Sequence, residues 1–184
     1  MNCSFALLKE DQDKKYLLAT SQTKTRNNLV DIAADLLNGF LKLNKVAYKD
    51  IEKIYLNIGP GSFTGEKAGL NIAKTIWSLN ETIDIYTANT IEILTEMNGV
   101  GILDAKGQKS YVGVYENFNC LEPVKLVDNA EVESIITQYP HLPTKDYEGV
   151  DERAYFHGLL AILDSFTLEK NPKHLEPLYI KEPL

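Results

Sequence analysis

The fold is decided by the segment Ile54–Leu79, which reads IYLNIGPGSFTGEKAGLNIAKTIWSL. Its first residues, Ile54–Ile58, are mostly apolar and predict a buried strand. From Glu66 onward, apolar side chains recur at helical spacing and predict a helix that ends at Leu79. Strand and helix are joined by a glycine-rich loop, Gly59-Pro60-Gly61-Ser62-Phe63-Thr64-Gly65. The segment therefore predicts an α/β protein.

The Gly59–Gly65 loop precedes a helix, where backbone N–H groups can attract an anion. It matches neither of two well-known phosphate-binding motifs. The P-loop pattern needs glycine at Thr64 or Glu66, and the dinucleotide fingerprint needs its third glycine at Thr64. The favoured interpretation is a tight turn in which glycine supplies unusual backbone dihedrals, ahead of direct ligand binding.

The residues before this segment predict a β-hairpin and a helix. Cys3–Lys9 and Tyr16–Ser21 resemble strands and flank the charged stretch Glu10–Lys14. A helix is predicted over Arg26–Leu43, with Thr25 as its N-cap. Because its apolar stripe is wide, this helix is expected to be deeply buried or shared with a second helix from elsewhere.

The residues after this segment predict one more strand and helix and then a second lobe. The strand is Ile83–Tyr86, and the helix, Thr90–Met97, is capped by Asn89 or Thr90. We predict a first lobe over residues 1–98 and a reduced second lobe over residues 99–184. The second lobe is expected to contain strands at Val100–Leu103, Ser110–Tyr115 and Pro123–Val127, helices at Ala130–Tyr139 and Asp151–Ser165, and a loop over Pro140–Gly149.

Composition limits the classes of partner. The net charge is −7, and Arg26 and Arg153 are the two arginines, so strong direct binding to nucleic acid is not expected. Cys3 and Cys120 stand alone in the sequence, which favours reduced thiols and a cytoplasmic protein. No apolar run approaches the roughly 20 residues that cross a bilayer, so no membrane contact is expected.

No pattern in the sequence predicts catalysis or metal binding. His141, His157 and His174 lie far apart and form no HxxxH or HExxH pair. Ser62 is not in a GxSxG nucleophile elbow, because Thr64 occupies the second glycine position. We therefore predict neither catalytic nor metal-binding residues.

At Gly59–Gly65 the sequence resembles the signature of the TsaB (YeaZ) family. The similarity extends to Asp50–Ile54, which precedes the decisive strand, and to Leu103–Tyr115, which looks like the second-lobe hairpin of the family. Glu176–Lys181 is similar to the family's C-terminal tail. Together these segments follow the order of the family along most of the chain.

The resemblance implies an actin/Hsp70-like, ribonuclease H-like fold of two lobes, the second reduced. It implies a non-catalytic partner subunit of TsaD in the synthesis of threonylcarbamoyladenosine (t6A) beside the anticodon of tRNA. TsaE is expected to join the complex, and a homodimer is expected in isolation. No cofactor of its own is implied, although an adenine nucleotide can lie at the TsaD interface. The residues expected to bind the partner lie on the first two helices: Leu29, Ile32, Ala33, Leu36, Leu37, Phe40, Ala68, Ile72, Ala73 and Ile76.

Three departures from the family pattern stand out. The family opens with a strand ending in Asp-Thr-Ser, whereas Cys3–Lys9 looks like its second strand. We therefore expect the start to be truncated or misassigned, unless Cys3–Lys9 fills the central position of the sheet. Glu66-Lys67 replaces the family's Leu-Arg, and Lys24–Asn28 replaces its His-Ser region. The alternative function is a nucleotide-binding protein or a glycoprotease-like hydrolase of the same superfamily, which tight ATP binding would favour.

Overall fold

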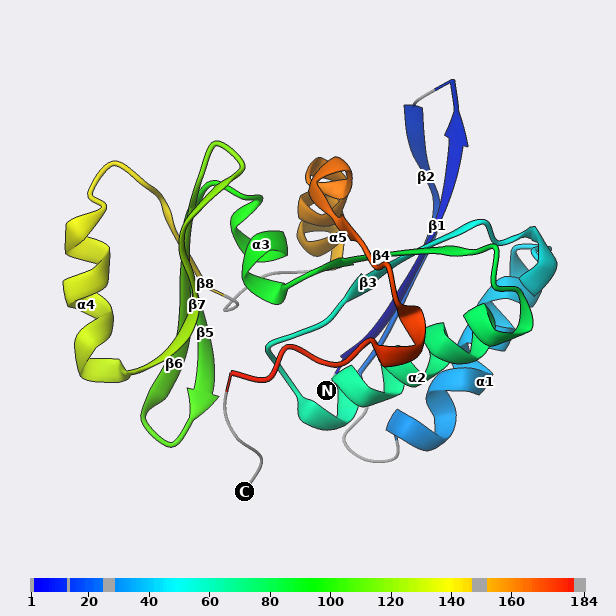
Figure 1. The fold of residues 1–184 in the computed structure, drawn as a ribbon, viewed down its shortest axis with the longest axis horizontal. Coiled ribbons are helices and arrows are strands. Elements are labelled where there is room, and N and C mark those ends of the chain that lie inside the picture. The colour runs from blue at the N-terminus through cyan, green and yellow to red at the C-terminus, as the bar shows by residue number, and fades with distance from the viewer. Residues whose placement is uncertain (1, 13, 25–28, 147–151, 181–184) are drawn as a thin grey trace.

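The computed structural model describes residues 2–12, 14–24, 29–146 and 152–180. Its strands form three sheets, shown in Figure 1: a two-stranded hairpin, a three-stranded sheet ordered β3-β4-β9 and a four-stranded sheet ordered β7-β6-β5-β8. The hairpin lies at one end of the molecule and the four-stranded sheet lies at the other. This arrangement confirms the predicted mixture of strands and helices.

The hairpin consists of β1 (Asn2–Asp11) and β2 (Lys14–Lys24), paired antiparallel. The predicted strands are confirmed, although each is longer than expected. β1 pairs with β2 alone, and within the described residues no strand joins the hairpin to the three-stranded sheet. Cys3–Lys9 therefore does not fill the centre of a larger sheet. A central position would have contradicted the expectation that the family's first strand is missing, and it is not observed.

Helix α1 (Leu29–Leu43) follows the hairpin and packs against α2 (Phe63–Leu79). The predicted α1 is confirmed from Leu29 onward, whereas the predicted cap Thr25 lies outside the described residues. α2 begins at Phe63, so the prediction that it begins at Glu66 is wrong. The physical reason is Ser62, which acts as the N-cap and accepts a hydrogen bond from the Gly65 N–H at 3.4 Å.

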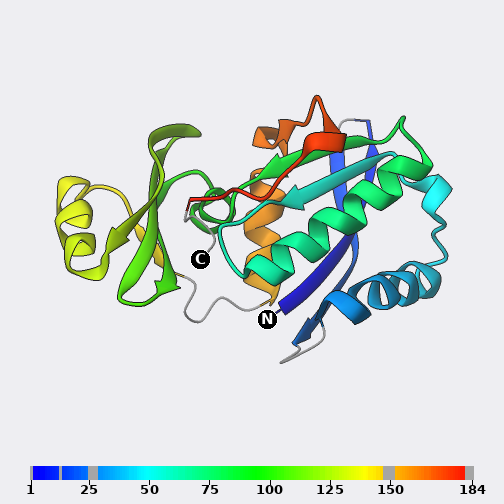
Figure 2. The same ribbon diagram turned by 60° about the horizontal axis from the view of Figure 1, so that its bottom comes forward.

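The three-stranded sheet lies between two helical layers. β3 (Lys53–Asn57) and β4 (Asp84–Ala88) pair in parallel, with α2 as their crossover. Alternate residues of a strand face opposite sides of the sheet. Ile54 and Leu56 therefore pack towards α2, whereas Tyr55 packs on the other side, in the cluster that contains residues of α5 (Glu152–Ala161) and of the segment that follows it. Figure 2 shows α2 and α5 on opposite sides of these strands. A short 3-10 turn, Tyr48–Asp50, leads into β3.

The four-stranded sheet forms the second lobe. β5 (Gly99–Lys106), β6 (Lys109–Glu116) and β7 (Asn119–Asp128) form an antiparallel meander, which confirms the three predicted strands. α4 (Asn129–Gln138) packs on one face, and α3 (Thr90–Thr95) packs on the other. Asn89, one of the two predicted caps, is the N-cap of α3, which ends two residues before the predicted Met97.

One strand of this sheet was not predicted. β8 (Thr144–Asp146) pairs in parallel with β5, although 140–149 was expected to be a loop. Its three residues are all exposed, so they carry no alternation of apolar and polar side chains. The strand is defined by its neighbour β5 and not by its own sequence pattern.

The chain returns to the first sheet after β8. β9 (Thr167–Leu168) pairs antiparallel with β4, and Leu175 packs in one cluster with Leu70, Ala73 and Ile85. Short 3-10 turns at Leu163–Ser165 and Pro172–His174 flank β9. The predicted division at residues 98/99 assigns this segment to the second lobe, whereas its strand pairing and packing are with elements of the first.

Candidate functional site

The predicted partner-binding residues lie on α1 and α2, and the structure brings most of them into the core of the chain itself. Leu37, Phe40 and Ile76 form one cluster with Leu41 and Ile83. Six of the ten are buried: Ala33, Leu37, Phe40, Ala68, Ala73 and Ile76. The side chain of Leu29 lies outside the described part of the chain. The apolar stripe of the two helices therefore holds them to each other and to the strands.

Three of the ten remain partly exposed, namely Ile32, Leu36 and Ile72. Ile72 packs against the cluster that contains Phe40 and Ile76. Ile32 and Leu36 lie one turn apart on α1 and belong to none of the four core clusters found among the described residues. They are therefore the predicted residues with the greatest freedom to contact a partner.

The exposed faces of the two helices carry opposite charges. On α1, the exposed acidic residues are Asp31 and Asp35, adjacent in sequence to Ile32 and Leu36. On α2, Lys67 is exposed and Lys74 is partly exposed. Sequence reasoning missed these residues because it followed the apolar stripe; the signal was the polar residues that recur at helical spacing between the apolar ones.

Two glycine N–H groups of the Gly59–Gly65 loop donate to side chains of the chain itself. The Gly59 N–H donates to Asn57 Oδ1 at 2.9 Å, and that same oxygen accepts from the Thr90 hydroxyl at 3.1 Å. The Gly65 N–H donates to Ser62 Oγ at 3.4 Å. Gly59 has φ +97°, a conformation that glycine adopts without strain.

Glu66 turns back from the first turn of α2 over this loop. A Cβ atom on Gly59 would lie 2.6 Å from Glu66 Oε1, and one on Gly61 would lie 3.4 Å from it. Oε1 is buried and has no hydrogen-bond partner among the described residues. Burial raises the pKa of Glu66, and the backbone N–H of Gly61 opposes this shift. The carboxyl group thus occupies the space that the missing glycine side chains leave.

The C-terminal segment packs beside the same loop. The Leu178 N–H donates to the Ile58 carbonyl at 2.8 Å, and the rings of Tyr179 and Phe63 lie 6.0 Å apart. Phe63 also contacts Lys67, whose Nζ atom lies 4.1 Å from the centre of the ring in a cation–π contact. The loop, the first turn of α2 and the tail that resembles the family pattern therefore form one contiguous surface.

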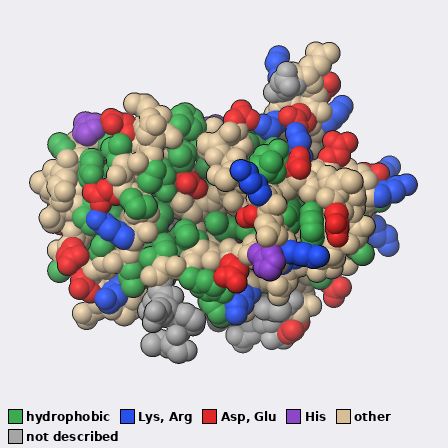
Figure 3. Space-filling model, viewed as in Figure 1, with side chains coloured by type: hydrophobic (Ala, Val, Ile, Leu, Met, Phe, Trp, Pro, Cys, Tyr) green, Lys and Arg blue, Asp and Glu red, His purple; other side chains and the backbone are tan. Residues whose placement is uncertain are grey.

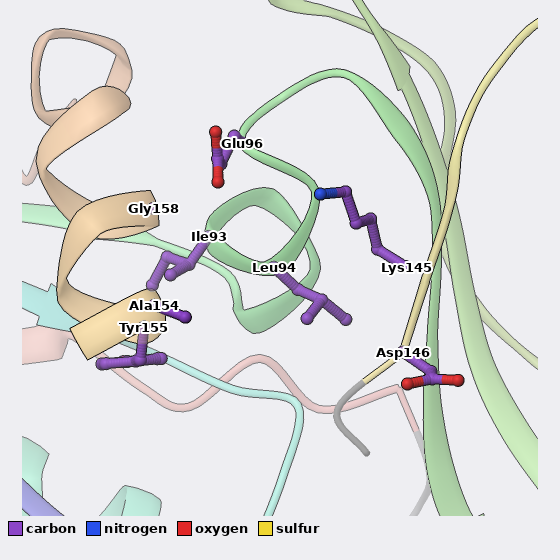
Figure 4. A pocket seen from close by; sticks show the side chains of 8 residues that line it. All are labelled: Ile93, Leu94, Glu96, Lys145, Asp146, Ala154, Tyr155 and Gly158. Atoms are coloured by element: carbon purple, nitrogen blue, oxygen red, sulfur yellow. The ribbon is translucent and has the colours of Figure 1, made fainter. Parts of the chain in front are cut away.

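A small pocket lies between α3, α5 and β8 (Figure 4). It is lined by Ile93, Leu94, Glu96, Lys145, Asp146, Ala154, Tyr155 and Gly158 and has a volume of about 100 Å³. Leu94 and Ile93 extend towards its centre, and Lys145 reaches across from β8. Sites for small-molecule ligands usually measure about 300–1,000 Å³, so this pocket is too small for a nucleotide.

The charged groups do not assemble a metal site within the described residues, where no cluster of three or more His, Cys, Asp or Glu side chains could hold an ion. His141 lies 3.1 Å from Glu116, and His157 and His174 are exposed elsewhere. On the face drawn in Figure 3, acidic and basic side chains are interspersed. No described helix is long and apolar enough to cross a membrane.

Comparison with known sequences found relatives over most of the chain. No protein-family model matches the sequence. The uncharacterized protein MG208 homolog of Mycoplasma pneumoniae is 28% identical over 163 residues, which cover 86% of this chain and 80% of that protein. The tRNA threonylcarbamoyladenosine biosynthesis protein TsaB of Bacillus subtilis is 32% identical over 123 residues, covering 63% of this chain and 51% of TsaB.

Comparison with solved structures found the same fold. An uncharacterized protein with similarity to peptidase YeaZ from Pseudomonas aeruginosa superposes with a TM-score of 0.71 at 11% identity, over 98% of this chain and 94% of that one. YeaZ from Pseudomonas aeruginosa superposes with a TM-score of 0.54 at 14% identity, over 69% of this chain and 62% of that one. The chain thus has the actin/Hsp70-like fold expected from the sequence. The chain is thus similar in sequence to about half of TsaB and shares the fold of the YeaZ structures.

Proposed function

We propose that the protein is a non-catalytic, cytoplasmic accessory subunit in t6A modification of tRNA that docks on TsaD. The sequence similarity to TsaB supports the pathway. The observation that carries the docking role is the partly exposed pair Ile32 and Leu36 on α1, which lies outside the core clusters beside Asp31 and Asp35. An apolar contact rimmed by charges is typical of a protein interface.

The same surface supports a homodimer of the isolated protein. α1 offers the acidic residues Asp31 and Asp35, and α2 offers the basic residues Lys67 and Lys74. A two-fold axis that places α1 of one copy on α2 of the other would pair these charges twice, because an isologous interface repeats each contact. TsaD would then replace the second copy, and TsaE would bind the resulting complex.

The test is the solution mass of the protein alone and mixed with TsaD of the same organism. Leu36→Arg is the test variant, because it places a charge at the centre of the proposed contact and leaves the buried residues intact. Leu121→Arg is its matched control, since Leu121 is an exposed leucine of the second lobe. We expect the wild type and the control to shift from homodimer to heterodimer, and Leu36→Arg to lose at least about tenfold in affinity for TsaD.

Two outcomes would contradict the proposal. The first is that Leu36→Arg binds TsaD as tightly as the control, which would exclude this face of α1. The second is that the wild type ignores TsaD and binds ATP tightly on its own, which would favour the nucleotide-binding alternative. Ala33→Arg and Ala73→Arg are unsuitable as interface tests, because both alanines are 2% exposed and a charge there would unfold the chain.

A further inference from the structure

The Gly59–Gly65 loop lies at the start of a long helix, where an anion is normally favoured. Backbone N–H groups at such a position, together with the helix dipole, form a binding site for phosphate or carboxylate in many proteins. In this chain the carboxylate of Glu66 lies against the loop, with Oε1 2.6 Å from the Cβ position of Gly59 and 3.4 Å from that of Gly61. The loop therefore holds an anion that belongs to the chain itself.

The geometry leaves little room for a second anion. Glu66 Oε1 lies within 2.6 Å of the point where a Gly59 side chain would begin, and this oxygen is shielded from solvent. Two glycine donors of the loop are already engaged, since Gly59 binds Asn57 and Gly65 binds Ser62. An external phosphate would have to displace the Glu66 carboxylate and would meet its negative charge.

We infer that Glu66 is the residue that determines the ligand specificity of this loop, because its carboxylate serves as an internal anion and excludes phosphate groups. The inference concerns the loop alone and does not depend on docking to TsaD. It gives a physical reason why a glycine-rich strand-to-helix loop of this kind would be closed to phosphate.

The chain provides a matched control for this inference. Glu92 also lies in the first turn of a helix, and its Oε2 accepts the Asn89 N–H at 2.7 Å. Replacing either glutamate with alanine changes the net charge by the same amount, so general attraction of phosphate to the protein changes equally. Only Glu66→Ala removes the carboxylate that covers Gly59 and Gly61.

The experiment is a titration of wild type, Glu66→Ala and Glu92→Ala with inorganic phosphate, followed through the amide NMR signals of Gly59, Gly61 and Gly65 at about pH 8, where glutamate is ionised in solution. We expect Glu66→Ala to bind phosphate at the loop about tenfold or more tightly than the other two proteins, because the like charge and the occupied volume are both removed. Glu66→Gln, which keeps the shape and removes the charge, should lie between wild type and Glu66→Ala.

Two results would overturn the inference. One is a wild-type Gly61 signal that responds to phosphate as strongly as that of Glu66→Ala. The other is a Glu66→Ala loop that responds no more than the Glu92→Ala loop. If Glu66→Ala fails to fold, Glu66→Gln decides, since a Gly61 response equal to that of the wild type would show that the carboxylate charge excludes nothing.

Discussion

The β1–β2 hairpin and the four-stranded sheet are both mainly antiparallel, but they differ in whether their strands have a neighbouring strand on both sides. β5 lies between β6 and β8, and β6 lies between β5 and β7, so each of these strands has a partner on both sides. β1 has a strand partner on one side alone, and so has β3 in the neighbouring sheet, within the described residues. A backbone edge without a partner leaves N–H and C=O groups that need another donor or acceptor.

Side-chain burial follows the same difference. In the four-stranded sheet, Val100 and Val114 are 0% exposed, because α4 covers them and neighbouring strands flank them. In the hairpin, Leu17 and Leu18 on β2 are 40% and 60% exposed. Phe5, Leu7 and Ala19 of the hairpin pack against the cluster that contains Leu37, Phe40 and Leu41 of α1. One part of the hairpin is therefore covered by a helix, whereas the part at Leu17 and Leu18 is exposed.

The largest expected difference between the two regions is in amide hydrogen exchange. Alternate residues of β1 direct their N–H groups away from β2, so they should exchange at least about a thousandfold faster than those of β5 and β6. Native-state exchange followed by NMR measures this residue by residue. Continuous protection along β1 and β3 would break the comparison, because it would show that something covers their unpaired edges in solution.

A smaller effect is expected from core truncation. Val114→Ala should lower the free energy of unfolding by about 2–3 kcal/mol, because it leaves a cavity in a fully buried cluster. Leu18→Ala, which removes a larger side chain from an exposed site, should cost less than about 0.5 kcal/mol. Urea denaturation of both variants provides the measurement. Equal losses would show that the hairpin is packed in solution against a surface that the described residues do not include.

The comparison also explains which features could be predicted from the sequence. The strands of the hairpin and the β5–β7 meander were predictable, because each has its own run of β-type residues. β8 and β9 are three and two residues long, and their identity depends on pairing with β5 and β4. Strand pairing between distant segments leaves no periodic signal in such short stretches, so both were missed.

The candidate site was predictable only in outline. The sequence predicted α1 and α2 in the right order, although α2 begins within the predicted loop at Phe63. An apolar stripe looks the same whether it faces a partner or the chain's own core. Ala33 and Ala73 were thus assigned to an interface although both are buried. The position of Glu66 over Gly59 and Gly61 depends on the path of the loop, which Ser62 sets by starting α2 early. The spacing of residues in the sequence does not predict the backbone path of this loop, so the position of Glu66 could not be predicted.

A further modest effect is expected at Glu66, in the first turn of α2, which tests how one partly buried polar group beside the four-stranded sheet is tolerated. Its charge reaches Tyr111 on β6, where burial first and the Glu66 charge second raise the tyrosine pKa. Because burial raises the pKa of Glu66 in the folded state, folding favours the protonated form. The stability of the wild type should therefore fall as pH rises from the ordinary glutamate pKa through the raised folded value.

Glu66→Gln should remove that dependence, since glutamine keeps the shape of the side chain and carries no charge. We expect the variant to be about 1 kcal/mol more stable than the wild type at neutral pH, the scale of one poorly satisfied buried polar group. The difference should vanish below about pH 4, where the carboxyl group of the wild type is protonated in both states. Denaturation curves of the two proteins across this range measure it. A wild type that is more stable than Glu66→Gln at neutral pH would mean that the charge on Glu66 holds the loop to α2 more strongly than burial opposes it.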